Sequence, residues 1–287
     1  MISVESCVIL VSIILNALGG TPVKPYHGIY LYSDLDGTLL QDDKTVSDEN
    51  YAALTRFLDG GGSFGIATGR PLPHIARFRD RLPITAPCIL CNGAAVYDFS
   101  RQQYLRLFPL DKALACQTIR QVEALLPDVS VQIFTEHTIY MVNPNQRDDL
   151  YIIWDNLPRV HVLPEQVEEP FWKILFCHRG EILDEAVPKL HLAPELITYR
   201  SEETYFEVLA QAKGGALAAW RPNLPECKKL LTIGDYENDL SLLAAGDVCA
   251  APANALPCVR QAATIQVCDN NHGAVADFLQ QAVFSKF

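Results

Sequence analysis

The chain is poor in positive charge. Its 287 residues include 23 Lys and Arg against 34 Asp and Glu, which gives a formal net charge of -11. A surface that binds nucleic acid needs a basic stripe, so we expect no nucleic-acid partner. Internal repeats and low-complexity tracts are also absent. With 49% hydrophobic and 20% charged residues, the chain is typical of globular proteins and is long enough for one large α/β domain or two smaller ones.

Long apolar runs are absent too. The segment VILVSIILNAL, at 8–18, is shorter than the roughly 20 residues that a membrane helix needs. A secretory signal would begin with positive charge, but Glu5 and no Lys or Arg precedes this run. We therefore expect residues 1–27 to form an N-terminal extension of a cytoplasmic protein with no membrane partner. Export directed by this segment is the alternative, because Ala17, Gly19 and Gly20 resemble a cleavage region.

The cysteines do not form a disulfide pattern. There are nine, an odd number at irregular spacing, in a chain too long to need covalent staples. We therefore expect reduced thiols. Cys88 and Cys91 form one C-x-x-C pair, but no second pair and no nearby His completes a zinc site, so a zinc or redox role for this pair is only an alternative.

The most informative segment is YLYSDLDGTLL, residues 30–40. The apolar run at 28–32 is typical of a central strand in a parallel sheet, and ligands bind at the carboxyl ends of such strands. Asp34 and Asp36 follow the run, and their side chains can face one site because alternate residues of an extended segment point the same way. Two acids so close favour a divalent cation between them, Mg²⁺ above all. The alternative is that both acids only end the strand and cap the next turn.

The rest of the chain predicts an α/β fold, a doubly wound parallel sheet with an inserted α+β domain. A helix at 47–58 with Ser47 as its N-cap is followed by strands at 63–67 and 88–91, which is a βαβ pattern. Residues 96–206 change to short alternating strands with a helix at 111–126, which favours an inserted cap with an antiparallel sheet. The doubly wound pattern resumes with strands at 229–233, 247–250 and 263–267. We therefore expect a core of residues 28–95 and 207–287 and a cap of residues 96–206.

Polar side chains follow several of these strands. They are Asp34, Asp36, Thr68, Asn92, Asp235, Asn238 and Asp239, and Lys213 stands at the expected start of a helix. A carboxylate nucleophile splits a phosphoryl transfer into two easier steps, and a second carboxyl group can move the protons. Hydroxyl, amide and ammonium donors stabilise the transferring oxygens, and the remaining acids can hold Mg²⁺.

Four motifs in this order resemble those of the haloacid dehalogenase-like superfamily of hydrolases. They are DLDGTLL at 34–40, ATGR at 67–70, KGGAL at 213–217 and GDYEND at 234–239. Asn92 and Gly93, with the large insert between the second and third motifs, resemble the Cof-type sugar-phosphatase branch, in which the insert is a cap. Four ordered motifs are far more specific than one, so they favour a site over a strand cap at Asp34.

The resemblance implies a role for each residue. Asp34 would be the nucleophile, Asp36 the general acid and base, and Lys213 the cation that steadies the nucleophile and the phosphoryl group. The metal would be held by Asp34, Asp235, Asp239 and the Asp36 carbonyl group. The phosphate would be bound by Thr68, Gly69, Asn92, Lys213 and Asn238.

Other positions leave alternatives open. Asn92 is also compatible with a simple Asn-Gly turn, and Arg70 with a solvated arginine. Glu207 resembles a position at which the branch returns from its cap, but we expect a surface acid on a strand there. The insert also carries His137, His161, His178 and His191, which could line a pocket although nothing in their spacing indicates it.

The predicted function is a Mg²⁺-dependent phosphatase that acts on a small phosphorylated metabolite, with a hexose or pentose phosphate as the first candidate. A phosphomutase or phosphotransferase is the alternative enzyme, and a non-catalytic binding protein on the same fold is the alternative from another class. The superfamily's dehalogenating members lack the second acid, so Asp36 favours phosphate chemistry. The sequence carries no signal for an oligomeric state.

Overall fold

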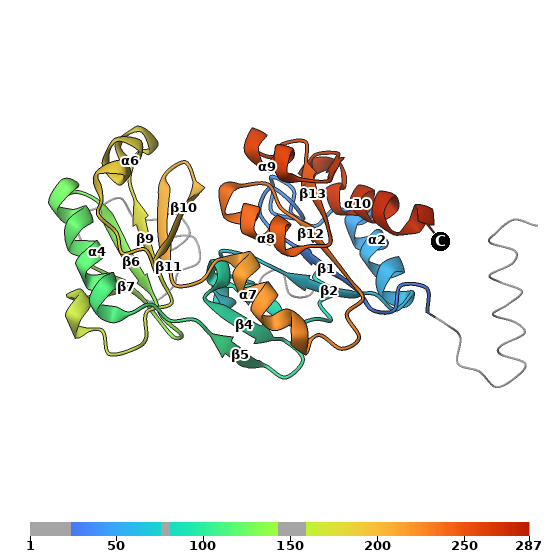
Figure 1. The fold of residues 1–287 in the computed structure, drawn as a ribbon, viewed down its shortest axis with the longest axis horizontal. Coiled ribbons are helices and arrows are strands. Elements are labelled where there is room, and N and C mark those ends of the chain that lie inside the picture. The colour runs from blue at the N-terminus through green and yellow to red at the C-terminus, as the bar shows by residue number, and fades with distance from the viewer. Residues whose placement is uncertain (1–23, 76–80, 143–158, 287) are drawn as a thin grey trace, which may run out of the picture.

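The computed structural model describes residues 24–75, 81–142 and 159–286. They form two lobes that lie side by side, with the middle of the chain in one lobe and both flanking parts in the other (Figure 1). No helix in these ranges is long and apolar enough to cross a membrane. The apolar segment at 8–18, and with it the alternative of export, lies outside the described residues.

The larger lobe, the core, is built on a five-stranded parallel sheet. Its strand order is β14-β13-β12-β1-β2, and every neighbouring pair is parallel. The strands are β1 (Ile29–Ser33), β2 (Ser63–Ile66), β12 (Lys229–Ile233), β13 (Val248–Pro252) and β14 (Ile265–Val267). All five residues of β1 are buried, as expected for a central strand covered on both faces. The prediction of a doubly wound parallel sheet is confirmed.

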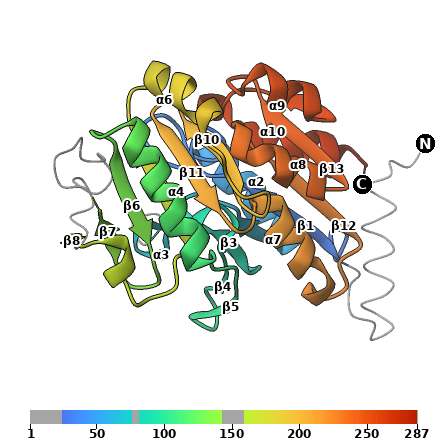
Figure 2. The same ribbon diagram turned by 60° about the vertical axis from the view of Figure 1, so that its left-hand side comes forward.

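Helices cover both faces of this sheet (Figure 2). On one face α2 (Asp48–Asp59) and α10 (Ala274–Ala282) pack against Leu31 and Phe64. On the other face α7 (Lys213–Trp220) and α8 (Leu240–Ala245) pack against Tyr30 and Tyr32. The short helix α9 (Pro257–Ala262) packs on α8 and β13. Neighbouring residues of β1 thus point to opposite faces of the sheet. Because helices cover both faces, the whole strand is apolar.

The helix expected at 47–58 is confirmed as α2. Ser47 is its N-cap, and the Ser47 hydroxyl accepts a hydrogen bond from the Asn50 backbone N–H at 3.2 Å. Asp48 and Glu49 occupy the first turn, where acids interact favourably with the helix dipole. This helix end is therefore specified by residues next to one another in the sequence.

A small second sheet extends the core. It consists of β3 (Cys88–Leu90), β4 (Ala95–Asp98) and β5 (Gln103–Leu107), paired antiparallel in this order. An isolated parallel bridge from Ala67 to Ile89 connects it to the end of β2. The 3₁₀ segment η2 (Cys91–Gly93) packs beside β3 and β4, and the helix α3 (Leu72–Ile75) lies between β2 and β3 in the chain.

The smaller lobe, the cap, has a six-stranded sheet with the order β10-β11-β9-β6-β7-β8. All of its pairs are antiparallel except β7 with β8. Its strands are β6 (Ser130–Phe134), β7 (Ile139–Met141), β8 (Arg159–His161), β9 (Lys173–Cys177), β10 (Ile197–Glu202) and β11 (Tyr205–Leu209). The helices α4 (Lys112–Leu125) and α6 (Gly180–Ala186) cover one face, over Ile133, Phe176 and Val208. The opposite face carries Phe134, Leu175 and Tyr205 and is turned toward the core.

Strand pairing favours boundaries between the core and the cap that differ from those expected from the sequence. We expected residues 96–206 to be the cap, but β4 and β5 pair with β3 of the core, and β11 lies wholly in the cap sheet. The start of the core differs as well, because the Tyr26 ring stacks on the Phe57 ring at 5.9 Å although residue 26 was expected in the extension. We therefore place the cap at about residues 108–210.

Short 3₁₀ segments join the larger elements. They are η3 (Pro164–Gln166), η4 (Val187–Lys189), η5 (Arg221–Asn223), η6 (Glu237–Asp239), η7 (Asn270–His272) and η8 (Phe284–Lys286).

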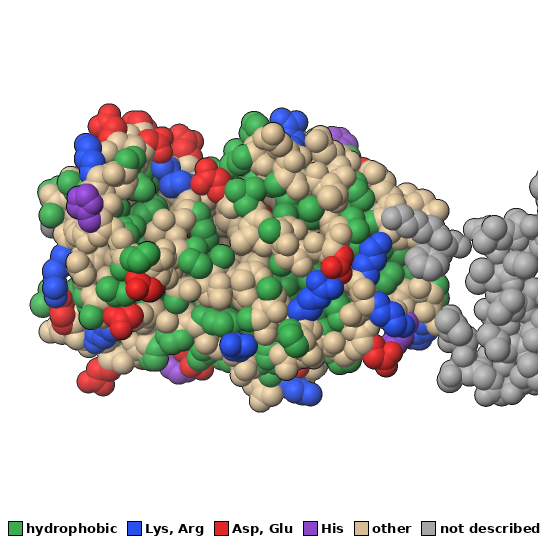
Figure 3. Space-filling model, in the orientation of Figure 1, with side chains coloured by type: hydrophobic (Ala, Val, Ile, Leu, Met, Phe, Trp, Pro, Cys, Tyr) green, Lys and Arg blue, Asp and Glu red, His purple; other side chains and the backbone are tan. Residues whose placement is uncertain are grey.

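On the face drawn in Figure 3, Lys and Arg side chains are scattered among the other types, while acidic side chains gather at the upper end of the cap.

Candidate active site

The site forms where β1 and β12 end side by side. Asp34 directly follows β1, and the Asp34 N–H donates to the Ile233 carbonyl at 3.0 Å, at the end of β12. Asp235 lies two residues beyond that strand. Gly37 has a φ of +73°, and a Cβ atom there would lie 2.4 Å from the Asp235 carboxylate. Glycine is therefore required for the loop after β1 to approach the loop after β12.

Lys213 connects two of the acids. Its side chain is fully buried at the start of α7, and its Nζ lies 2.6 Å from Asp34 Oδ1 and 2.6 Å from Asp239 Oδ1. Burial acts to lower the pKa of Lys213, but the charges of Asp239 and Asp34 outweigh it and raise the pKa above the usual lysine value. The ammonium group therefore stays charged and holds Asp34 in one orientation.

Three carboxylates gather here. One oxygen from each of Asp34, Asp235 and Asp239 lies within 4.8 Å of the other two. Burial raises the pKa of Asp34 well above its usual value, and burial followed by the charge of Asp239 raises the pKa of Asp235 to about 7. Such carboxylates are costly to ionise without a cation, and hard oxygen ligands suit Mg²⁺. The donor set of this site thus fits a magnesium ion.

The three acids are not equivalent as ligands. Asp239 Oδ1 accepts from Lys213, and Asp239 Oδ2 accepts from the backbone N–H groups of Asp235 at 3.0 Å and Tyr236 at 3.2 Å. Its carboxylate therefore holds Lys213 and the loop after β12. Asp34 and Asp235 are left as the side chains best placed for a metal.

Asp36 is held away from this group. Arg70 donates to both of its oxygens, from Nε at 2.7 Å and from an Nη at 2.8 Å, and Lys44 Nζ lies 2.8 Å from Oδ1. Burial acts to raise the pKa of Asp36, but these two cations outweigh it and lower the pKa to about 2. Among the described residues, the carboxylate of Asp36 is not part of the acidic group at Asp34.

A cavity between the core and the cap is lined by Asp34 and Asp235, and the expected phosphate-binding residues other than Lys213 lie around it. Thr68, Gly69, Asn92 and Asn238 all line it, and Thr68 Oγ1 accepts from the Arg70 N–H at 3.2 Å. Asn92 has a φ of +56°, a left-handed conformation that asparagine tolerates better than most residues. Its Oδ1 accepts from Asn238 Nδ2 at 3.0 Å. Lys213 does not line the cavity and acts on it through Asp34.

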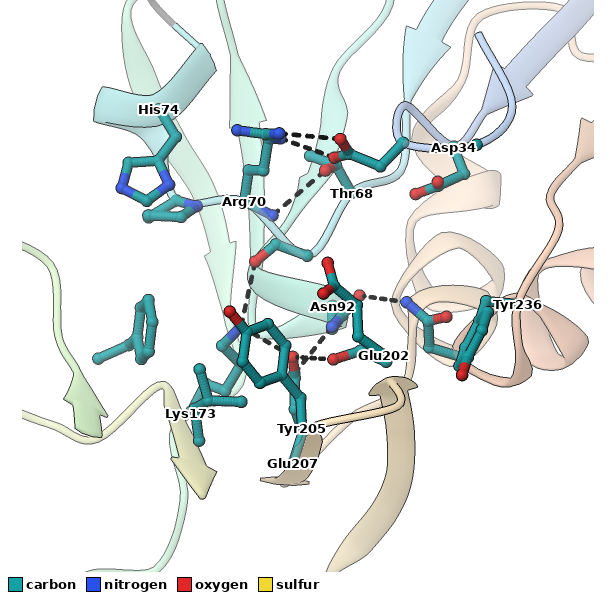
Figure 4. Close-up of a pocket in the computed structure, with 18 of the residues that line it drawn as sticks. Asp34, Thr68, Arg70, His74, Asn92, Lys173, Glu202, Tyr205, Glu207 and Tyr236 are labelled. Carbon is teal, nitrogen blue, oxygen red and sulfur yellow. Dashed lines mark hydrogen bonds and ion pairs between the residues drawn. The ribbon is translucent and has the colours of Figure 1, made fainter. Parts of the chain in front are cut away.

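Glu207 is buried, contrary to the expectation from the sequence. We expected a surface acid, but its side chain is 3% exposed and lies between the cap and the core. Glu207 Oε2 accepts from Asn92 Nδ2 at 2.8 Å, and Oε1 lies 3.2 Å from Lys173 Nζ. Figure 4 shows Asn92 with Lys173, Tyr205 and Glu207 of the cap on one side and Asp34, Thr68 and Arg70 of the core on the other.

Sequence reasoning missed several side chains of the cavity. Lys173, Lys44, His74 and Tyr205 were not singled out, yet all four line it. Of the histidines considered in the insert, His178 is buried and pairs with Asp128 instead. None of the candidate histidines with a described side chain lines the cavity. A lysine at the start of an apolar strand, as in KILF at 173–176, carries no local signal for a site.

The eight cysteines within the described ranges form no disulfide. Burial raises the pKa of Cys91 to about 12, which makes its thiolate scarce at neutral pH. Cys88 and Cys91 also belong to no potential metal cluster in the described part of the chain.

Comparisons with known proteins show the family of the chain. A family model for haloacid dehalogenase-like hydrolases matches residues 31–279. The chain is 28% identical to the 5-amino-6-(5-phospho-D-ribitylamino)uracil phosphatase YitU of Bacillus subtilis, over 90% of this chain and 97% of that protein. It is 27% identical to the pyridoxal phosphate phosphatase YbhA of Escherichia coli, over 86% and 95%.

A solved structure agrees as well. The crystal structure of TM0651 from Thermotoga maritima superposes with a TM-score of 0.72 at 26% identity, over 89% of this chain and 97% of that one. The match thus includes the inserted cap as well as the core. The expectation of a phosphoric monoester hydrolase is confirmed by relatives that are named phosphatases. The chain therefore belongs to the haloacid dehalogenase-like hydrolase family, as a phosphatase of the Cof type.

Proposed function

We propose that this protein is a Mg²⁺-dependent phosphatase that hydrolyses a small phosphorylated metabolite through an aspartyl-phosphate on Asp34. The observation that carries the proposal is the buried Lys213 ammonium, which holds Asp34 at 2.6 Å beside two further acids at the same edge of the sheet. A carboxylate oriented in this way is prepared to act as a nucleophile. A protein that only binds its ligand has no need for such an arrangement.

Asp34 and Asp235 would hold the magnesium ion, with the Asp36 carbonyl group as a further ligand. When bound, the ion supplies positive charge that offsets the acids and the charge that develops on the phosphoryl oxygens. Thr38 donates to Asp235 Oδ1 at 2.6 Å and so orients this ligand from the other side.

The reaction on Asp34 has two steps. In the first, a carboxylate oxygen attacks phosphorus, the bond from phosphorus to the leaving oxygen breaks, and the leaving oxygen takes up a proton. In the second, water attacks the aspartyl-phosphate, loses a proton and releases phosphate, which restores the carboxylate. Lys213 keeps Asp34 oriented in both steps, while Thr68, Gly69, Asn92 and Asn238 bind the phosphoryl oxygens.

Asp36 would move both protons. A pKa of about 2 leaves almost no protonated Asp36 at neutral pH, so this side chain has to leave Arg70 and Lys44 before it can protonate a leaving oxygen. A phosphorylated substrate offers Arg70 a competing anion. Substrate binding would therefore release Asp36 for its role.

The cavity supports a small substrate. Its volume is about 280 Å³, and the cap contributes the apolar side chains Phe134, Leu175 and Tyr205 to its wall. These side chains suit a leaving group with an apolar or planar face. Two relatives are named for ring compounds, pyridoxal phosphate and a phosphoribitylamino-uracil, so we place such phosphates beside hexose and pentose phosphates as candidates.

The test is phosphate release from an aryl phosphate and from a panel of these metabolites. We expect turnover in Mg²⁺, none after chelation with EDTA, and recovery on adding Mg²⁺ back. The variant Asp34→Asn should lose turnover, because an amide cannot form the aspartyl-phosphate. Asp59→Asn, at the exposed end of α2, is the matched control and should keep wild-type turnover. Turnover retained in Asp34→Asn would contradict the mechanism.

A further inference from the structure

A buried polar cluster joins the cap to the core beside the cavity. We call it the junction cluster: Lys173 and Glu207 of the cap, and Asn92 and Asn238 of the core. Their exposed fractions are 3%, 3%, 0% and 7%, respectively. All four side chains also line the cavity, and Figure 4 labels Asn92, Lys173 and Glu207 among them. Buried charges and amides are costly unless they are paired, and every buried side-chain nitrogen and oxygen atom of this cluster except Asn238 Oδ1 has a hydrogen-bond partner.

The carboxylate of Glu207 decides which way the Asn92 amide points. A carboxylate only accepts hydrogen bonds, so the end of the Asn92 side chain that faces Glu207 Oε2 at 2.8 Å must be the NH₂ group. Asn92 Oδ1 then faces Asn238, whose Nδ2 donates to it at 3.0 Å. Glu207 of the cap thus orients the Asn92 amide directly and the Asn238 amide through Asn92.

Other cap side chains hold this arrangement in place. Ser201 donates to Glu207 Oε1 at 2.6 Å, and Lys173 Nζ pairs with the same oxygen at 3.2 Å, which leaves Oε2 for Asn92. Tyr199 donates its hydroxyl hydrogen to the Asn92 carbonyl at 3.0 Å. Lys173 also donates to the Gly69 carbonyl at 3.2 Å. The contacts of the cap therefore end on the loops that carry Gly69 and Asn92.

We propose that Glu207 is a positioning residue, which sets the phosphate affinity of the site by orienting the side-chain amides of Asn92 and Asn238. This inference rests on the proposed function, in which both amides bind phosphoryl oxygens. With the Asn92 amide oriented by Glu207, one N–H of each amide is used within the cluster and the other is left to donate to an anion. The cap thereby contributes to phosphate binding as well as to recognition of the leaving group.

The test compares Glu207→Gln with the wild type. Glutamine keeps the size of the side chain but can also donate a hydrogen bond, so it no longer dictates the orientation of Asn92. We expect the inhibition constant of inorganic phosphate and the KM for an aryl phosphate to rise about tenfold, which corresponds to about 1.4 kcal/mol, with a smaller change in kcat. Unchanged constants would overturn the proposal.

A double-mutant cycle shows whether Glu207 acts through Asn92. Asn92→Gly removes the amide, and glycine readily adopts the φ of +56° at this position. If Glu207 acts through Asn92, adding Glu207→Gln to Asn92→Gly should weaken phosphate binding no further. If the two effects multiply, Glu207 acts in another way and the proposal fails.

A second pair of variants covers the possibility that Glu207→Gln alone unfolds, since it leaves Lys173 buried without its partner. Glu207→Gln with Lys173→Met removes both charges, and Lys173→Met alone is its reference. We expect the double variant to bind phosphate about tenfold more weakly than Lys173→Met. Equal affinity would mean that Glu207 serves only as the counter-ion of Lys173, which contradicts the proposal. A wild-type protein that releases no phosphate from any substrate would instead contradict the proposed function.

Discussion

Replacing Lys213 by Met should destabilise the folded protein strongly. The lysine side chain is fully buried and makes two ion pairs of 2.6 Å, with Asp34 and Asp239. Methionine has a similar length but leaves both acids without their cation. Breaking a buried ion pair by removing one partner costs about 3–5 kcal/mol. That is a large part of the about 5–15 kcal/mol by which a folded protein is stable.

The assay is urea unfolding in the presence of EDTA, so that no metal replaces the lost cation. With a slope of about 3 kcal/mol per molar urea for a chain of this size, the midpoint should fall by about 1–2 M. Lys189→Met, at an exposed position at the end of η4, is the matched control and should change stability by less than about 0.5 kcal/mol.

The loss of stability in Lys213→Met should also depend on pH. Burial already raises the pKa of Asp34 in the presence of Lys213, and removing the ammonium raises it further. A carboxyl group whose pKa is higher in the folded state contributes stability below its unfolded pKa, and this contribution disappears as the pH rises through the folded pKa. The deficit of Lys213→Met should therefore grow from pH 5 to pH 8. An unfolding midpoint equal to that of the wild type at pH 8 would refute the reasoning.

Two further substitutions test the elements that place the site. Ser47→Ala removes the hydroxyl that accepts from the Asn50 N–H, and it should lower the free energy of unfolding by about 1 kcal/mol without changing kcat, as measured by urea unfolding and an aryl-phosphate assay. Gly37→Ala places a Cβ atom 2.4 Å from the Asp235 carboxylate at a φ of +73°. We expect it to cost about 1–2 kcal/mol in backbone strain and to weaken Mg²⁺ activation, measured by titrating the activity with Mg²⁺. Unchanged Mg²⁺ activation would show that the loop after β1 can move away from Asp235.

Local features were predicted well because short-range physics specifies them. The apolar run before Asp34 became β1, and Ser47 became the cap of α2. Both depend on residues that are neighbours in the sequence.

The boundaries between core and cap differed from those expected because β4 and β5 are short antiparallel strands like those of the cap. Only their pairing with β3 assigns them to the core.

Glu207 shows why the rest could not be predicted. In YFEVL at 205–209, alternation correctly separates the two faces of the strand, since Phe206 and Val208 pack beneath the cap helices. Alternation does not reveal what covers the other face, and an acid on it was expected to meet water. In the folded protein that face meets the core, and Glu207 is buried against Asn92. The same reasoning applies to Lys173 on the neighbouring strand β9.

The sequence by itself determined which acids stand at the ends of the parallel strands and which lysine begins a helix, and with them the kind of chemistry. The motifs are contiguous, and the end of a strand is a local event. Only the tertiary structure decided how these groups are paired: Arg70 with Asp36, Lys213 with Asp34 and Asp239, and Glu207 with Asn92. These contacts join residues 26 to 179 positions apart, so the packing of the two lobes and of the strand ends had to bring them together.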